Sequence, residues 1–296
     1  MIKHNMAILN KKNTFYALYA MGAFLFFLWF LFPSDFFADY LETLIQQQGQ
    51  GVVVTIKEAR PSLPFALSLK GVEGEIPGGP MLKAESLRIS PGLISLFGVN
   101  PKVSFSSRIF GGKVSGTVTF PEKNPKKPSV ESIRISGLDL FELKDILTDY
   151  LPGYTLKGEL DATGDYSSDG RGNGALNLLV KDLVVAAEKP FFTIKDLTFP
   201  EISVEMEIKS KKVQIERCVI DGKEVDGTLS GSVFIRNPFD RSTLRLSGTL
   251  KPEKTFMEKL GANVPIEALI GKKMNADGEI PFSISGVASA PRYSLK

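Results

Sequence analysis

The sequence is poor in the side chains that most often carry chemistry. Its 296 residues include one cysteine, Cys218, and one histidine, His4. A single cysteine excludes a disulfide within the chain, so the fold depends on its own core or on partners. A single histidine near the start excludes imidazole acid–base chemistry and histidine-ligated metal sites from the rest of the chain.

The net charge is also small. The formal net charge is +3, and the only basic residues before residue 33 are Lys3, Lys11 and Lys12, with no acidic residue among them. The rest of the chain is therefore balanced in charge. That balance does not favour nucleic-acid binding, which needs a net basic surface.

One stretch lacks charge altogether. Residues 14–32 contain no Lys, Arg, Asp, Glu, Asn or Gln, and as a helix they would reach about 28 Å, close to the hydrocarbon thickness of a bilayer. We expect an uncleaved transmembrane signal anchor over residues 13–32, after a cytoplasmic tail of residues 1–12. The residues chosen to represent this anchor are Phe15, Leu18, Gly22, Phe26, Trp29 and Phe32.

Two other interpretations of this stretch are a buried core helix and a cleaved signal peptide. Its length and lack of charge disfavour the first, and the absence of a small-x-small site behind it disfavours the second. Lysines precede the stretch and acidic residues follow it, which predicts a cytoplasmic N-terminus with the bulk of the chain on the other side.

A short amphipathic helix is predicted next, over residues 33–49. Ser34 can cap it, and apolar residues from Phe36 to Ile45 recur at helical spacing. Such a helix either packs on the following domain or lies in the membrane interface, and the sequence leaves both alternatives open.

From Val52 onward, apolar and polar residues alternate. Ile202, Val204 and Met206, for example, alternate with Ser203 and Glu205. This period of two is typical of antiparallel strands with one dry and one wet face, and we count about a dozen such strands over residues 50–296. Hairpin signals separate them at 77–80, 168–170, 209–211 and 221–222.

Few helices accompany the predicted strands. Short ones are expected at residues 90–98, 140–151, 255–260 and 265–270, and none is long enough to cover the sheet. We therefore expect a mainly β fold: an elongated, curved antiparallel sheet whose dry faces meet each other or leave an apolar groove. Candidate groove residues are Leu67, Phe105, Val118, Leu160, Val204, Leu246 and Ile284.

Glycines fall in register with the apolar residues of these strands, which predicts that the dry face is the inside of a curl. They are Gly74, Gly116, Gly158, Gly164, Gly227, Gly231, Gly248, Gly278 and Gly286. The Pro-rich, basic segment 121–129 is a candidate boundary between two halves, and its lysines are a less favoured lipid-headgroup or partner site.

Candidate catalytic groups are weak. The glycine-rich segment 170–174 is not followed by a helix and predicts a hairpin, not a phosphate loop. Asp161 with Asp165 lies on a polar strand face without a partner base or metal ligand, so we expect solvated carboxylates. Cys218 interrupts the alternation, which predicts a bulge or a buried small side chain. We predict no enzyme activity, no metal and no cofactor.

Several segments together resemble a known family. They are the anchor, residues 89–98 between two strands, residues 110–116, residues 137–140 leading into a helix, and residues 284–295. In order and spacing these look like protein N of the type II secretion system and, more distantly, like AsmA-like envelope proteins.

The resemblance implies an accessory or scaffold protein of the bacterial inner membrane, with its bulk in the periplasm and other secretion components as partners. The AsmA-like relationship implies the alternative, a lipid-binding or lipid-transfer module. An envelope hydrolase is the third and least favoured hypothesis.

Overall fold

The computed structural model describes most of the chain, including almost all of its regular secondary structure. The described residues are 11–31, 33–48, 53–62, 65–75, 81–92, 95, 98, 100–121, 128–148, 151–167, 172–191, 194–261 and 273–296. They form two compact units, the first unit (Met1–Leu82) and the second unit (Lys83–Lys296).

The first unit begins with two helices, α1 (Lys11–Phe30) and α2 (Ser34–Gln48). Pro33 separates them, and its carbonyl accepts a hydrogen bond from the Phe37 N–H at 3.1 Å. None of the helices in the part of the chain that the structure describes combines the length and the mean hydropathy expected of a membrane span. The transmembrane assignment of residues 13–32 lacks support from this finding and stays a prediction, and Phe32 and Lys3 lie outside the described residues.

Helix α2 packs on β1 (Val53–Ser62), which forms a hairpin with β2 (Ala66–Glu75). Ala38 of α2 and Ile56 and Ala59 of β1 are all buried. The Glu42 carboxylate accepts a hydrogen bond from the Ile56 N–H at 2.5 Å. The predicted amphipathic helix therefore exists, and one of its faces is packed on the sheet.

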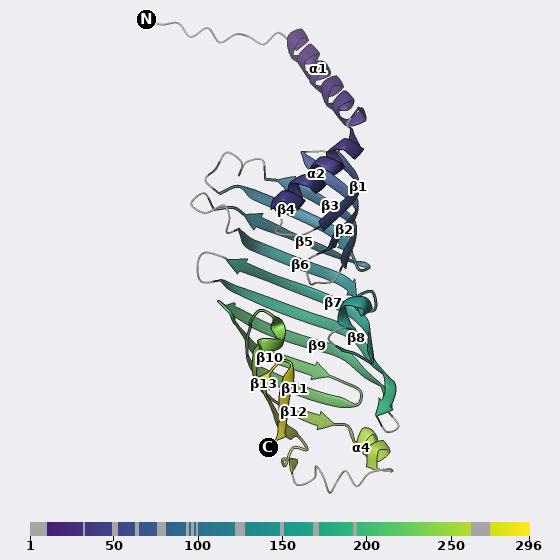
Figure 1. Cartoon of the computed structure of the whole chain (residues 1–296), viewed down its shortest axis with the longest axis vertical. Helices are drawn as coiled ribbons and strands as arrows, with labels where there is room; N and C mark the ends of the chain where they lie inside the picture. Colours follow the sequence, from purple (N-terminus) through teal and green to yellow (C-terminus); the bar gives the residue numbers. More distant parts are fainter. Residues whose placement is uncertain are drawn as a thin grey trace, which may run out of the picture. The chain divides into compact units, whose positions relative to one another are not determined.

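The second unit is built almost entirely of antiparallel strands, shown in Figure 1. They are β3 (Met81–Pro91, which begins in the first unit), β4 (Lys102–Ile109), β5 (Gly112–Thr119), β6 (Ser129–Asp139), β7 (Tyr154–Ser167), β8 (Asn173–Phe191), β9 (Ile194–Lys209), β10 (Lys212–Asp221), β11 (Val225–Phe234), β12 (Thr243–Pro252), β13 (Ile280–Val287) and β14 (Ala290–Leu295).

The order of the strands in the sheet is their order in the chain, with fourteen strands counting β1 and β2. Tight turns make this order possible. Phe110 and Gly111, between β4 and β5, both have positive φ, as a two-residue type I′ hairpin requires. Between β9 and β10, Ser210 has φ 59°. The prediction of a mainly β, antiparallel fold is confirmed.

The short helices agree less well with the sequence. Helix α4 (Lys254–Gly261) forms where residues 255–260 predicted one. The helix predicted over 140–151 shrinks to α3 (Lys144–Leu147), because Leu140 pairs with the strand region through its N–H to the Gly158 carbonyl. A 3₁₀ turn, η2 (Phe239–Arg241), was not predicted. The helix predicted at 265–270 lies outside the described residues. The one predicted at 90–98 does not begin at Ser90, because Ser90 and Pro91 belong to β3, and residues 93, 94, 96 and 97 lie outside the described residues.

Candidate functional site: an apolar sheet face

The registers of the second unit place its apolar residues on one face. Residues directly opposite each other on antiparallel strands project on the same side of the sheet. Following these pairs from β3 to β14 gives an unbroken row with one residue from each strand. Row 1 consists of Ile89, Phe105, Gly116, Ile133, Gly164, Leu176, Met206, Ile215, Gly231, Leu246, Ile284 and Tyr293.

Two further rows flank row 1, two residues away along each strand except at Val130 of β6 and Cys218 of β10, which are three residues away because of register shifts. Row 2 consists of Pro91, Val103, Val118, Val130, Tyr166, Gly174, Ile208, Val213, Val233, Leu244, Gly286 and Pro291. Row 3 consists of Leu87, Ser107, Val114, Ile135, Ala162, Leu178, Val204, Cys218, Leu229, Gly248, Phe282 and Leu295. No member of the three rows is charged, and they define what we call the apolar face.

The bulges of the sheet preserve this face. Register shifts occur at β5–β6, at two places in β6–β7, at β7–β8 and around Cys218 in β10. Two of these shifts lie within the rows: Val130 and Ile133 of β6, and Ile215 and Cys218 of β10, are three residues apart and still project on the same side. Cys218 itself is buried beside such a shift, which confirms both features predicted for it.

Five of the seven candidate groove residues belong to this face, and a sixth, Leu160, lies next to it on the same side. Phe105, Leu246 and Ile284 lie in row 1, Val118 in row 2 and Val204 in row 3. Leu160 pairs with Leu138 and Val180 on the same side, one step beyond row 3. Leu67 belongs instead to the first unit, where it pairs with Pro61 of β1. All seven are half-buried.

Glycines of the apolar face sit beneath large neighbours. A Cβ on Gly116 would lie 2.5 Å from the Ser132 carbonyl oxygen and 2.8 Å from the ring of Phe105. Gly248 is likewise overlaid by the Phe282 ring, with a Cβ-to-ring distance of 3.0 Å. The predicted register with the apolar residues is confirmed for the glycines that lie in the rows, which are Gly116, Gly164, Gly231, Gly248 and Gly286. Gly74 lies in the first unit, Gly158 at the β7–β8 register shift, and Gly278 precedes β13 with φ +78°.

No further layer covers the apolar face within the described residues. The strands of the second unit contact chiefly their neighbours in the sheet, and neither α3 nor α4 is packed across them. Most members of the three rows are consequently half-buried, and Tyr293 on β14 is 74% exposed. Whether the face curls into a closed groove stays a prediction.

The size of this face is unusual for a water-exposed surface. At about 4.8 Å per strand, the rows run for roughly 50 Å, and three rows two residues apart span roughly 13 Å. The resulting area, on the order of 700 Å², exceeds the largest apolar patch of most soluble monomers. A surface of this kind is expected to have an apolar partner.

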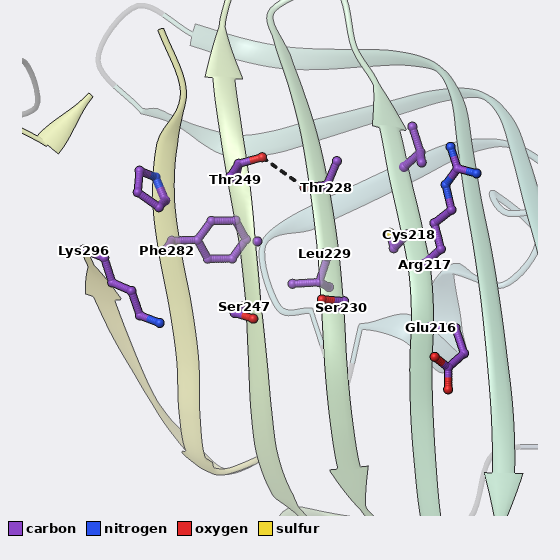
Figure 2. Close-up of a pocket in the computed structure, with 13 residues that line it drawn as sticks. Glu216, Arg217, Cys218, Thr228, Leu229, Ser230, Ser247, Thr249, Phe282 and Lys296 are labelled. Carbon is purple, nitrogen blue, oxygen red and sulfur yellow. Dashed lines mark hydrogen bonds between the residues drawn. The ribbon is translucent and has the colours of Figure 1, made fainter. Parts of the chain in front are cut away.

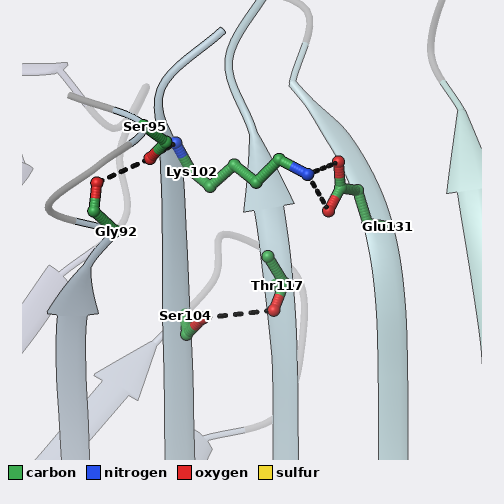
Figure 3. Close-up of polar contacts among 6 residues, drawn as sticks. All are labelled: Gly92, Ser95, Lys102, Ser104, Thr117 and Glu131. Carbon is green, nitrogen blue, oxygen red and sulfur yellow. Dashed lines mark hydrogen bonds and ion pairs between the residues drawn. The ribbon is translucent and has the colours of Figure 1, made fainter. Parts of the chain in front are cut away.

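The opposite face of the second unit is polar and held by hydroxyls and ion pairs. Figure 3 shows one such cluster on β4 to β6. Lys102 Nζ lies 2.7 Å from a carboxylate oxygen of Glu131, and the Ser104 and Thr117 hydroxyls are hydrogen-bonded at 3.2 Å. The Lys102 ammonium lowers the pKa of the Glu131 carboxyl, mainly through this hydrogen bond. Ser95 Oγ accepts the Lys102 N–H at 2.9 Å and so ties the β3–β4 connection to the sheet.

Asp161 has a structural role that the sequence did not suggest. Its carboxylate accepts hydrogen bonds from Lys181 Nζ at 2.8 Å and from the Gly137 N–H at 2.9 Å. Gly137 lies in the bulge of β6, where the ladder to β7 is interrupted. The Lys181 ammonium, followed by the Gly137 N–H, lowers the pKa of Asp161. The prediction of a merely solvated carboxylate is wrong here, because Asp161 supplies the acceptor that the bulge removes.

The second unit has shallow depressions on its surface. The one in Figure 2 has a volume of about 560 Å³ and involves β10 to β13. Cys218, Leu229 and Phe282 of row 3 contribute to its lining. The Thr228 and Thr249 hydroxyls project on the polar side of the same strands, where they are hydrogen-bonded at 3.0 Å.

We find no assembled catalytic or metal site in the parts of the chain that are described. No group of three or more His, Cys, Asp or Glu side chains is arranged to hold a metal ion there. The thiol of Cys218 is buried, and burial raises its pKa, which disfavours the reactive thiolate.

Comparison of the chain with protein-family models, with curated proteins and with solved structures finds no match.

Proposed function

We propose that this chain is a membrane-anchored protein of the bacterial envelope that holds lipid acyl chains on the apolar face of its second unit. The observation that carries the proposal is the set of three unbroken rows, uncharged from β3 to β14. A protein interior would explain apolar rows if another layer covered them, but none of the described elements does so.

Acyl chains fit this face in size and chemistry. One acyl chain spans about half of a bilayer core, or roughly 15 Å, whereas the face runs for roughly 50 Å. Each methylene removed from water contributes about 0.8 kcal/mol. A face without charged side chains accepts such a chain without the cost of desolvating a charge, and its half-buried rows leave room for contact.

Anchoring is assigned to α1. Its described side chains are exposed and apolar on several sides of the helix, with Phe15 at 68%, Leu18 at 64% and Phe26 at 56%. Large apolar side chains exposed all around a helix favour a lipid environment. In the proposed topology α1 lies in the inner membrane, the N-terminus is cytoplasmic and the second unit is periplasmic.

The test uses the full-length chain in proteoliposomes with a photoreactive amino acid at one of two adjacent positions. Val204 belongs to row 3, whereas Glu205 projects from the polar face and is exposed. The proposal expects the group at 204 to capture lipid and the group at 205 to capture little. Equal capture at both positions, or none at 204, would contradict acyl-chain binding.

A second candidate function is an accessory or scaffold role in the type II secretion system. Its motivation is the family resemblance, together with strand β14, which pairs with β13 and has no second strand neighbour among the described residues. Tyr293 and Leu295 of β14 are exposed, so this edge can receive a strand from a partner protein. The two candidate functions are compatible in one protein.

Copurification distinguishes this second function. The full-length chain, extracted in mild detergent, is expected to retain other inner-membrane secretion components, and Tyr293→Lys with Leu295→Lys is expected to weaken that retention. A matched double substitution on the exposed polar side, Ser247→Lys with Ser285→Lys, should leave it unchanged. Clean separation of the wild-type chain from all secretion components would contradict the scaffold role.

A further inference from the structure

Helix α2 has apolar side chains on two adjacent sides, and only one of these sides is packed. The packed side carries Phe37, Ala38, Leu41 and Ile45, which are buried or half-buried, with Ala38 2% exposed. This side faces β1, as the contact of Glu42 with the Ile56 N–H shows. A helix that served only to cover the hairpin would need no apolar residue elsewhere.

The adjacent side forms an exposed apolar stripe of Phe36, Tyr40 and Leu44. These residues are four positions apart and therefore line up along one side of the helix. They are 74%, 55% and 37% exposed. Three large apolar side chains aligned in this way cover most of the length of a 15-residue helix. The Tyr40 ring lies near the Phe37 ring of the same helix, with 6.3 Å between the ring centroids, and Tyr40 is still 55% exposed.

Apart from Glu42, whose carboxylate is hydrogen-bonded to β1, charge is confined to the remaining part of the helix surface. Residues 34–48 contain no Lys or Arg. Asp35 and Asp39 are exposed and, at 100° per residue, project away from both the packed side and the exposed stripe. The helix thus has one side for the sheet, one for an apolar medium and one for water.

We infer that the stripe of Phe36, Tyr40 and Leu44 lies in the interface of a lipid bilayer, so that α2 rests along the membrane surface. The inference rests on the proposed anchoring by α1. Phe36 follows the end of α1 at Phe30 by six residues, so a helix that leaves the bilayer delivers the stripe to the headgroup level. Aromatic residues such as Phe and Tyr favour that level.

The nature of the contact follows from the absence of basic residues. An interfacial helix rich in Lys or Arg binds anionic headgroups, but α2 offers only acidic and neutral groups. The stripe therefore contacts the membrane by apolar insertion, and its binding is expected to be insensitive to anionic lipid and to salt. In this arrangement α2 carries β1 and β2 at the membrane surface, because its packed side holds the hairpin.

Tryptophan fluorescence of the full-length chain in liposomes tests the inference. Trp29 is the only tryptophan, so the wild-type protein reports on α1, and variants in a Trp29→Phe background report on α2. Tyr40→Trp places the reporter on the stripe, and Gln46→Trp places it on the exposed polar side as the matched control. Brominated lipids and aqueous iodide measure contact with acyl chains and with water.

Brominated lipid is expected to quench wild-type Trp29 strongly. It should quench the tryptophan at position 40 about threefold or more above the one at position 46, because the stripe is inserted to interfacial depth and the polar side is not. Quenching of Trp29 with an iodide-accessible position 40 would overturn the inference and leave the anchor intact. If neither position 29 nor position 40 is quenched by lipid, both fail. Photocrosslinking from Leu44 to a protein, with no lipid captured, would also overturn the inference.

Discussion

A charge placed on the apolar face is predicted to remove lipid binding when it replaces Leu246. This side chain lies in row 1 between Gly231 and Ile284 and is half-buried. In Leu246→Glu, about three methylenes of an acyl chain that passes over this position lose their apolar contact. At about 0.8 kcal/mol each, the binding free energy weakens by roughly 2 kcal/mol. That loss alone corresponds to about a 30-fold weaker association, and desolvation of the new carboxylate adds to it.

The control is the neighbouring residue on the other face. Ser247 is exposed and projects from the polar side, paired with Ser230 and Ser283. Ser247→Glu adds the same charge one residue away and should leave lipid binding unchanged. Because both positions are on β12 and neither is fully buried, both variants are expected to fold, which circular dichroism checks.

Photolabelling measures the effect in the membrane-bound, full-length chain. A phospholipid with a diazirine in its acyl chain is titrated into proteoliposomes, and labelled peptides are quantified by mass spectrometry. Labelling of α1 serves as an internal reference for each sample. Leu246→Glu should lower labelling of β10 to β13 at least tenfold relative to α1, whereas Ser247→Glu should not. Unchanged labelling in Leu246→Glu, or an equal loss in both variants, would refute the reasoning.

Three further predictions concern stability and reactivity of the full-length chain in one detergent. Gly116→Ala forces a Cβ against the Ser132 carbonyl and the Phe105 ring, so it should lower the free energy of unfolding by about 2 kcal/mol. The control is Gly74→Ala, whose Cβ would meet only Val54 at 4.0 Å and should leave the free energy of unfolding unchanged. Equal denaturation midpoints for the two variants would contradict the steric argument. Asp161 has a lowered pKa in the folded protein, so its stabilising effect is present above its unfolded pKa of about 3.9 and is lost as pH falls through the folded value. Asp161→Asn should therefore be less stable than wild type at pH 7, and the difference should shrink in acid; a difference that grows in acid would show that the sign is wrong. Cys218 is buried with a raised pKa, so iodoacetamide should modify it at least about tenfold more slowly in the folded than in the unfolded chain; equal rates would show that the thiol is accessible.

The alternation of residue types was sufficient to predict the strands and their dry face. Val204 and Met206 alternate with Ser203 and Glu205, and the structure places the first pair on the apolar face. Glycines such as Gly116, Gly164 and Gly248 could also be assigned to that face from register alone. The period of side-chain alternation is a local property of the sequence, so it can be recognised without knowing which strands pair.

Strand pairing and the polar contacts could not be predicted in the same way. Asp161 and Lys181 are 20 residues apart, and their contact depends on the register of β7 with β8 and on the bulge that exposes the Gly137 N–H. The short helix α3 also differed from its pattern, because pairing of Leu140 with Gly158 overrode local helical preference. Long-range pairing decided these features.

The most direct test of the central claim is a cryo-electron microscopy map of the full-length chain in lipid nanodiscs. The account predicts elongated, unbranched density of acyl-chain length against the apolar face, over residues such as Phe105, Leu246 and Ile284. Protein density covering these rows, or an apolar face closed upon itself with no space for a chain, would contradict it.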